Sequence, residues 1–139
     1  MPVPPAVEAS AGALRVLVAD DYYANQRLVT RLLEKRGYAV EVVADGQAAV
    51  DATLDRAFDL VLMDCQMPLL DGYEATARIR SLERGRRTPI LAMTANDSLE
   101  SRDACLRAGM DDYLTKPIKA AVVLAAVDRW SAIGRGGAR

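Results

Sequence analysis

The segment DLVLMDCQMPLLDGYE, residues 59–74, contains a short apolar run that ends at Asp64 and is followed by a helix start signal. Four further runs share this short, nearly unbroken apolar character, which is typical of strands buried on both faces of a parallel sheet. They cover residues 14–19, 39–44, 89–93 and 113–114. Because the stretches between the runs are long enough for helices, the alternation predicts an α/β fold. Its right-handed crossovers would place helices on both faces of one sheet.

Capping residues predict where the helices begin and end. Asp71 followed by Glu74 forms a capping box, and Asp97 with Glu100 offers the same device for a helix that Gly109 ends. Further helices are expected over about residues 23–36, from about residue 46, and after Pro117. The apolar side chains expected to face the sheet are Leu28, Leu32 and Leu33 in the first helix, Ala48, Ala49, Val50 and Leu54 in the second, Ala75, Ile79 and Leu82 in the third, and Ile118, Val122, Ala126 and Trp130 in the last.

Length and composition predict one folded domain. The chain has 139 residues, of which 51% are hydrophobic, and this is enough for a single core. We expect the folded unit to cover residues 14–133, with residues 1–13 as a disordered linker or arm and residues 134–139 as a flexible tail. The 18 basic and 19 acidic residues nearly balance, which argues against direct binding to nucleic acid.

The cysteines and the apolar stretches indicate the compartment. Cys65 and Cys105 lie far apart in the sequence, and nothing resembles a secretory leader, so we expect a reducing, cytoplasmic location. No apolar stretch is long enough to span a bilayer. We therefore expect no membrane contact by this segment, although a longer parent chain could be attached to a membrane.

Polar side chains follow or end four of the apolar runs: Asp20 and Asp21, then Asp64, Thr94 and Lys116. In an open parallel sheet, ligands bind beyond the carboxyl ends of the strands. If the runs that precede Asp20 and Asp64 are neighbouring strands, three carboxylates meet there and repel one another, so they must bind a cation, hold protons or be strained. Mg²⁺ takes oxygen ligands of this kind, whereas a chain with no histidine and two separated cysteines is poorly suited to zinc.

This set of side chains suits phosphoryl transfer onto a carboxylate. Asp64 is the candidate nucleophile, while the metal and Lys116 would neutralise charge on the incoming phosphoryl group. Thr94 and backbone N–H groups would hold its oxygens. In this chemistry the protein mainly positions and screens the reacting groups.

Four sequence strings resemble the receiver domains of two-component response regulators. They are the Asp20-Asp21 pair, LVLMDCQMPLLDGYEA at residues 60–75, MTAN at residues 93–96 and DDYLTKP at residues 111–117. The resemblance covers about residues 14–130. It implies a flavodoxin-like, doubly wound sheet of five parallel strands in the order 2-1-3-4-5, with five helices on its two faces.

The resemblance also implies a metal site and a phosphoacceptor. Asp64 is similar to the family's phosphoacceptor, Asp21 to a direct Mg²⁺ ligand and Asp20 to a ligand that acts through water. The backbone carbonyl of Gln66 would be a third protein ligand.

Further positions match the phosphoryl-binding and switch residues of the family. Thr94 resembles the switch hydroxyl that turns toward the phosphoryl group, and Tyr113 resembles the aromatic residue that follows it inward. Lys116 would pair with phosphoryl oxygens, and the peptide bond before Pro117 is expected to be cis. Backbone N–H groups of Ala95 and Cys65 would complete the site.

The resemblance implies partners as well. The phosphoryl donor would be a histidine kinase or a histidine phosphotransfer protein, and the domain would catalyse transfer to Asp64 and its own slow dephosphorylation. The chain has no histidine, so the donor must lie elsewhere in a longer chain or on a partner. The helix ending at Gly109, the strand at residues 113–114 and the helix after Pro117 would form a face that contacts kinase domains or a second copy.

Alternatives remain open from sequence. The strings most resemble receivers of hybrid histidine kinases, but a free-standing single-domain regulator is the alternative. A dehalogenase-like phosphatase also uses a strand-end aspartate, Mg²⁺ and a lysine, yet it usually places an acid where this chain has Gln66. A pure binding module is a third reading. Tyr22 and Gln66 depart from common family residues, so access to the pocket and the dephosphorylation rate are open.

Overall fold

Five parallel strands form one sheet in the computed structural model, which describes residues 13–137. The strands are β1 (Arg15–Ala19), β2 (Ala39–Val43), β3 (Leu60–Asp64), β4 (Ile90–Thr94) and β5 (Asp112–Thr115). Their spatial order is β2-β1-β3-β4-β5, so the predicted flavodoxin-like arrangement is confirmed. The expected arm at residues 1–13 lies almost entirely outside the described residues.

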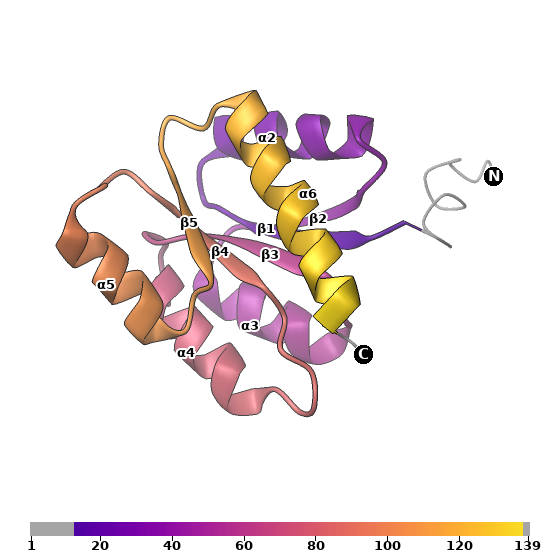
Figure 1. Cartoon of the computed structure of the whole chain (residues 1–139). Helices are drawn as coiled ribbons and strands as arrows, with labels where there is room; N and C mark the ends of the chain where they lie inside the picture. Colours follow the sequence, from indigo (N-terminus) through magenta and orange to yellow (C-terminus); the bar gives the residue numbers. More distant parts are fainter. Residues whose placement is uncertain (1–12, 138–139) are drawn as a thin grey trace.

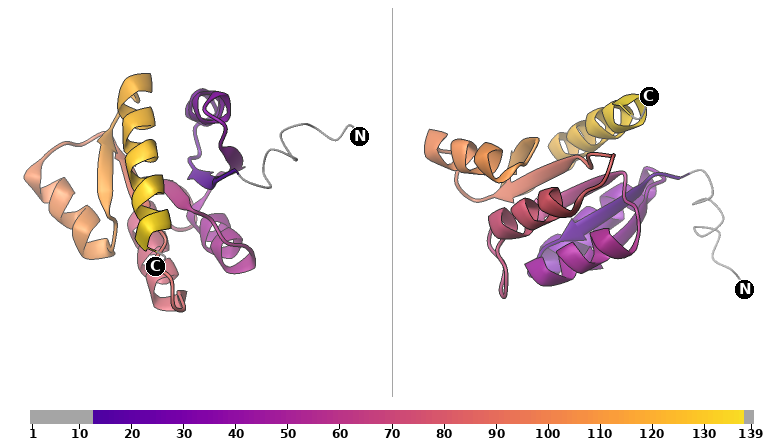
Figure 2. Two further views of the ribbon diagram at one scale, coloured as in Figure 1. Left: turned by 45° about the vertical axis from the view of Figure 1, so that its right-hand side comes forward. Right: turned by 90° about the horizontal axis from the view of Figure 1, so that it is seen from below.

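Five helices cover the two faces of the sheet (Figure 1). They are α2 (Tyr23–Lys35), α3 (Gly46–Asp55), α4 (Gly72–Leu82), α5 (Leu99–Ala108) and α6 (Ala120–Gly137). Side chains of α2 and α6 pack into one buried cluster, and side chains of α3, α4 and α5 pack into another. Figure 2 shows α6 across the sheet from α3 and α4.

Burial within the sheet follows the strand order. Every residue of the central strands β3 and β4 is buried, and β1 is buried except at its first residue. All five residues of the edge strand β2 are only half-buried. The prediction of strands buried on both faces is therefore confirmed for the centre of the sheet, where the site residues lie.

The two predicted capping boxes had different outcomes. Asp71 accepts from the N–H of Glu74 at 2.8 Å while the Glu74 carboxylate accepts from the N–H of Asp71 at 3.2 Å, so α4 has the predicted capping box. The prediction for α5 was wrong, because Ser98 is its N-cap. The Asn96 side chain accepts from the N–H of Ser98 at 2.9 Å, and this turn delays the start of α5 by one residue. Gly109, at φ 107°, ends α5 as predicted.

Some helix faces differ from the prediction by about one residue. Leu28 is 41% exposed and its neighbour Val29 is buried, and Val122 is 53% exposed beside the buried Val123. Each helix buries a narrow stripe of side chains, and the way the helix crosses the sheet decides which stripe this is. The apolar pattern of each helix allowed either of two neighbouring residues to face the sheet. Leu54 and Leu82, also expected to face inward, are 59% and 41% exposed.

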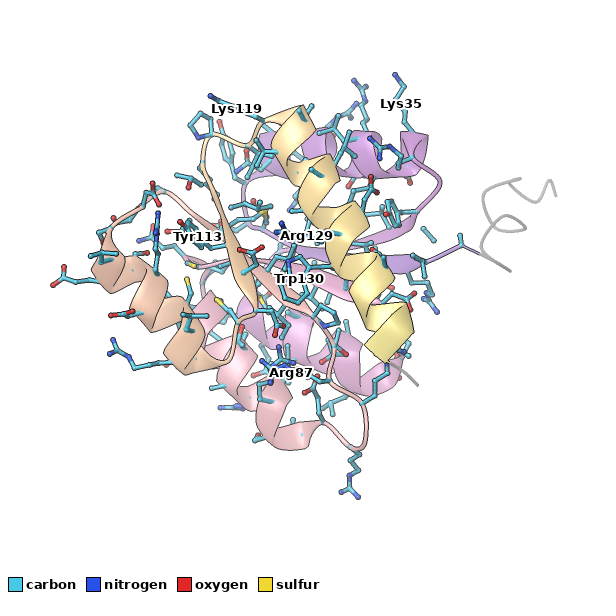
Figure 3. All side chains as sticks on the ribbon, viewed as in Figure 1. Lys35, Arg87, Tyr113, Lys119, Arg129 and Trp130 are labelled. Atoms are coloured by element: carbon cyan, nitrogen blue, oxygen red, sulfur yellow. The ribbon has the colours of Figure 1, made fainter. Side chains whose placement is uncertain are left out.

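The last helix extends beyond the expected end of the folded unit. We placed that end at residue 133, but α6 continues to Gly137. Trp130, expected on the inward stripe, is half-buried and packs against the cluster on this face. Its indole N–H donates to the Asp112 carboxylate at 2.9 Å, which joins α6 to the beginning of β5 (Figure 3).

Candidate functional site

Three aspartates meet at the carboxyl edge of the sheet. Asp20 and Asp21 follow β1, and Asp64 ends the adjacent strand β3. Oxygen atoms of the three carboxylates lie within 4.8 Å of one another. Asp20 and Asp64 are buried and Asp21 is exposed. The structure therefore brings together the acidic residues that the sequence predicted to meet.

The surroundings of Asp20 fit a bound cation. One carboxylate oxygen accepts from the N–H of Tyr22 at 2.8 Å, while the other is buried and has no hydrogen-bond partner among the described residues. A buried carboxylate oxygen needs a compensating donor or cation. Oxygen ligands from two or three carboxylates on an open rim suit a hard divalent ion such as Mg²⁺.

Lys116 reaches into the same cluster from the end of β5. Its Nζ lies 3.1 Å from Asp64 Oδ2 and 3.8 Å from Asp20 Oδ2. The backbone places it there, because the N–H of Lys116 donates to the carbonyl of Thr94 at 2.7 Å. The peptide bond between Lys116 and Pro117 is cis. Asp21 makes no ion pair with any residue that the structure describes, so one of the three negative charges has no cation beside it.

Burial is the main influence on the Asp64 carboxyl, and it raises the pKa of this group above its usual value. The hydrogen bond from the N–H of Gln66, at 3.1 Å, and the Lys116 ammonium act against this shift, while the nearby Asp20 charge adds to it. A cation in the cluster would favour the ionised, nucleophilic form of Asp64.

Thr94 and Ala95 line a cavity of about 800 Å³ that opens beside Asp64. The Thr94 hydroxyl donates to the carbonyl of Asn96 at 3.3 Å and accepts from its N–H at 3.0 Å. The Thr94 side chain is thus held in its own turn, on the wall of the cavity that Asp64 and Lys116 also line.

The prediction for the Cys65 backbone was wrong. Its N–H donates to the carbonyl of Met93 at 3.0 Å, because pairing between β3 and β4 continues one residue beyond Asp64. This N–H is therefore not available to a phosphoryl oxygen. The N–H of the next residue, Gln66, donates to the Asp64 carboxylate instead. Only the exact residue at which hydrogen bonding between β3 and β4 ends could have predicted this difference.

Gly72 allows the chain to return close to Asp64. A Cβ atom at this position would lie 2.2 Å from the carbonyl oxygen of Asp64 and 2.9 Å from the Cα of Cys65. The N–H of Gly72 donates to the carbonyl of Cys65 at 3.0 Å. The glycine therefore permits the close packing of the first turn of α4 against the end of β3.

Tyr113 lies on the side of β5 that faces α5 (Figure 3). It is half-buried and packs against the cluster formed with α3, α4 and α5. The guanidinium of Arg102, on α5, lies 5.0 Å from the centre of its ring. The sequence had suggested Tyr113 as a switch residue but gave no sign of this partner.

Several cavity residues were not predicted. The remaining wall of the cavity is formed largely by Tyr73, Asn96, Ser98, Glu100 and Ser101. Asn96 belongs to the quoted MTAN string, so its position two residues after Thr94 could have indicated it. The others lie at the starts of α4 and α5. Tyr73 belongs to the quoted string at residues 60–75 and Glu100 to a predicted capping box, but neither pattern indicated a place in the cavity.

Comparison with known proteins identifies the class of protein that this fold and site define. Residues 16–128 match the family described as Response regulator receiver domain, so the chain belongs to that family. It is 46% identical over 127 residues to the sensor protein GacS of Pseudomonas syringae pv. syringae. This match covers 89% of the chain but only 14% of GacS.

Solved structures of receiver domains have the same fold. The receiver domain of the sensor histidine kinase PA1611 from Pseudomonas aeruginosa is 44% identical, with a TM-score of 0.80, and the match covers 86% of this chain and 98% of that one. That structure contains a magnesium ion coordinated in the active site cleft. The receiver domain of Ssk1 from Saccharomyces cerevisiae, crystallised with the histidine phosphotransfer protein Ypd1, gives a TM-score of 0.81 at 28% identity. The match covers 87% of this chain and 90% of the solved one.

Proposed function

We propose that this domain accepts a phosphoryl group from a phosphohistidine onto Asp64. The observation that carries the proposal is the position of Lys116 Nζ, 3.1 Å from Asp64 and 3.8 Å from Asp20, within a cluster of three strand-end carboxylates. One buried nucleophile, a second carboxylate and a lysine on one rim suit phosphoryl transfer, in which positioning and charge neutralisation provide most of the catalysis.

The transfer step breaks one bond and forms one. An oxygen of the Asp64 carboxylate attacks phosphorus, the bond from phosphorus to the imidazole nitrogen breaks, and the imidazole leaves with the electron pair and then takes up a proton. Lys116 neutralises charge on the phosphoryl oxygens. The N–H of Gln66, which now donates to Asp64, is placed to donate to the acyl phosphate.

The cofactor in this proposal is Mg²⁺. Asp20, Asp21 and Asp64 would hold it together with the backbone carbonyl of Gln66. The buried Oδ2 of Asp20 supports this assignment, because it accepts no hydrogen bond from the described residues and has only Lys116, at 3.8 Å, as a cation nearby. When bound, the ion supplies positive charge that screens the carboxylates from each other and from the phosphoryl oxygens.

Phosphorylation is proposed to act through Thr94 and Tyr113. The acyl phosphate adds about −1.5 to −2 charges. Moving a two-state protein from mostly inactive to mostly active takes about 5.5 kcal/mol, and hydrogen bonds to charged groups contribute roughly 1.5 to 3 kcal/mol each. Hydrogen bonds to the phosphoryl oxygens from Thr94, Lys116 and the N–H of Ala95 could together supply this free energy. The face formed by α5, β5 and α6 would change, and slow self-catalysed dephosphorylation would reset it.

We further propose that the donor is a histidine kinase or a histidine phosphotransfer protein. The similarity to the GacS sensor protein and to the PA1611 receiver supports a hybrid histidine kinase as the parent protein. The receiver that was crystallised with Ypd1 supports the phosphotransfer alternative. Within the part of the chain that the structure describes, no helix has the length and apolar character needed to cross a membrane. We propose a cytoplasmic location for the domain.

Exposure to a small-molecule phosphodonor with Mg²⁺ tests the assignment of Asp64. Intact mass spectrometry should show the addition of one phosphoryl group, which hydroxylamine should remove because it cleaves acyl phosphates. Asp64→Asn should take up none. Asp51→Asn is a matched control, since Asp51 is exposed on α3 away from the site, and it should be phosphorylated normally. Uptake by Asp64→Asn would show that another residue is the acceptor.

A further inference from the structure

Arg102 connects three segments that surround the phosphoacceptor site. It lies on α5, its guanidinium is 5.0 Å from the ring centre of Tyr113 on β5, and one of its nitrogens is 3.2 Å from a carboxylate oxygen of Asp97 in the loop after β4. The side chain is 44% exposed, so it packs over the ring from the solvent side.

Arg102 covers the Tyr113 ring in the position that the ring has in this structure. The ring packs against the core on one side and under Arg102 on the other. Burial and then the Asp97 carboxylate raise the pKa of the Tyr113 phenol, and the Asp97 side chain is itself 56% exposed. An inward movement of Tyr113 would separate its ring from Arg102.

The same contact restrains the loop that carries the phosphoryl-binding groups. Asp97 lies three residues after Thr94, and the Thr94 hydroxyl is at present bonded within that loop to Asn96. If Thr94 turns toward Asp64, the backbone at Asn96 loses both of these bonds and the loop must move. Arg102 holds the far end of the loop through Asp97.

We propose that Arg102 is a latch, a positioning residue that favours the unphosphorylated arrangement by stacking on Tyr113 and pairing with Asp97. This inference rests on the function proposed for Asp64 and adds the residue that opposes the switch. A ligand that binds only the switched arrangement has a lower apparent affinity when only a small fraction of the protein is in that arrangement. Loss of the latch should therefore increase that affinity. Since cation–π contacts at exposed sites are modest, an increase of about two- to five-fold is expected.

Beryllofluoride, a phosphoryl mimic, provides the test. Its dissociation constant in saturating Mg²⁺ would be measured by titration calorimetry, with bound beryllofluoride followed by fluorine NMR. Arg102→Met, which keeps an apolar stem without the charge, should bind about two- to five-fold more tightly than the unmodified chain. A merely structural defect would weaken binding, so the direction of the change distinguishes a latch from damage.

Arg27 provides a matched control. Its guanidinium stacks on Tyr23 at 5.6 Å, but both residues lie on α2, away from α5 and β5. Arg27→Met should leave the dissociation constant of beryllofluoride unchanged. An equal effect of Arg27→Met would mean that loss of surface charge, and not the latch, strengthens binding.

A double-mutant cycle with Tyr113→Leu separates the stack from the ion pair. If Arg102 acts in part through the ring, Arg102→Met should have a smaller effect in the Tyr113→Leu background, where only the ion pair with Asp97 is left to lose. A full effect there would overturn the stacking argument. If the unmodified chain binds no beryllofluoride, the function proposed for Asp64 fails together with the latch. If it binds beryllofluoride and Arg102→Met binds equally well, the latch alone is wrong.

Discussion

Asp21→Asn should make the domain more stable without divalent cations and insensitive to Mg²⁺. Lys116 lies beside Asp64 and Asp20, whereas Asp21 has no such cation among the described residues. The Asp21 carboxylate therefore lies beside the carboxylates of Asp20 and Asp64, which share the single positive charge of Lys116. Replacing it with the isosteric amide removes the repulsion that only a bound cation would otherwise relieve.

The size of the effect follows from the spacing. At 4.8 Å, the upper limit of the spacing between these carboxylate oxygens, two unit charges repel by about 3.5 kcal/mol at an effective dielectric constant of 20 and by about 1 kcal/mol in bulk water. Lys116 cancels one of the two neighbouring charges, and Asp21 is exposed, so the lower value applies. A gain of about 1 kcal/mol in the free energy of unfolding corresponds to a rise of about 3 to 5 °C in Tm for a domain of this size.

Thermal unfolding in a chelator and then in excess Mg²⁺ measures both parts of this prediction. The unmodified chain should gain stability with Mg²⁺, by about 2.7 kcal/mol when the ion is at a hundred times its Kd, and Asp21→Asn should gain little. Asp51→Asn, also exposed, should behave like the unmodified chain in both conditions. A lower Tm for Asp21→Asn in the chelator would show that repulsion in the cluster is not a significant cost, and the electrostatic argument would be wrong.

Two further predictions concern stability and reactivity away from the acidic cluster. Arg80→Met should lower the free energy of unfolding by about 3 kcal/mol in urea titrations, because the 13% exposed Arg80 pairs with both Glu83 and Asp111. After its loss Glu83 would have no ion pair among the described residues, and Asp111 would keep only the exposed Arg87. Among the residues that the structure describes, the 44% exposed Arg86 pairs only with Asp59. Arg86→Met should therefore cost less than about 1 kcal/mol, and equal costs for the two variants would contradict the role of burial. Burial raises the pKa of the Cys65 thiol to about 12 from a usual 9.0, so at about pH 8 its thiolate should be roughly a thousandfold scarcer than that of a free cysteine. Thiol reagents should label Cys65 only after unfolding, and rapid labelling of the folded chain would contradict this.

The acidic cluster could be predicted from sequence because it depends on topology alone. The carboxyl ends of parallel strands share one edge, so residues that end adjacent strands must meet whatever the details of packing. Asp20 and Asp64 needed only the adjacency of β1 and β3. The same reasoning placed Lys116, since its backbone pairs with the end of β4.

Features that depend on small rotations or on the last residue of a ladder could not be predicted in this way. Val29 and not Leu28 is buried because α2 crosses the sheet in one of two directions that its apolar pattern allows. The N–H of Cys65 is used by β4 because pairing extends one residue further than the apolar run indicates. Arg102 meets Tyr113 only because of how α5 is rotated about its axis, and no local motif records that rotation.

The position of Lys116 between Asp64 and Asp20 would make the proposed metal ion and the proposed phosphoryl group interdependent. Lys116 now divides its charge between Asp64 and Asp20. A phosphoryl group on Asp64 would add about −1.5 to −2 charges and would draw the ammonium toward its oxygens. The buried Asp20 carboxylate would then be in greater need of a cation. A metal ion bound by Asp20 and Asp21 in turn frees Lys116 for the phosphoryl group. The metal ion would thus compensate the Asp20 carboxylate when Lys116 moves to the phosphoryl group. Thermodynamic linkage then requires that the metal ion and the phosphoryl group strengthen each other's binding by the same factor. The N–H of Lys116 also donates to the Thr94 carbonyl, so a movement of the lysine is transmitted to the end of β4 and to the loop that Arg102 restrains.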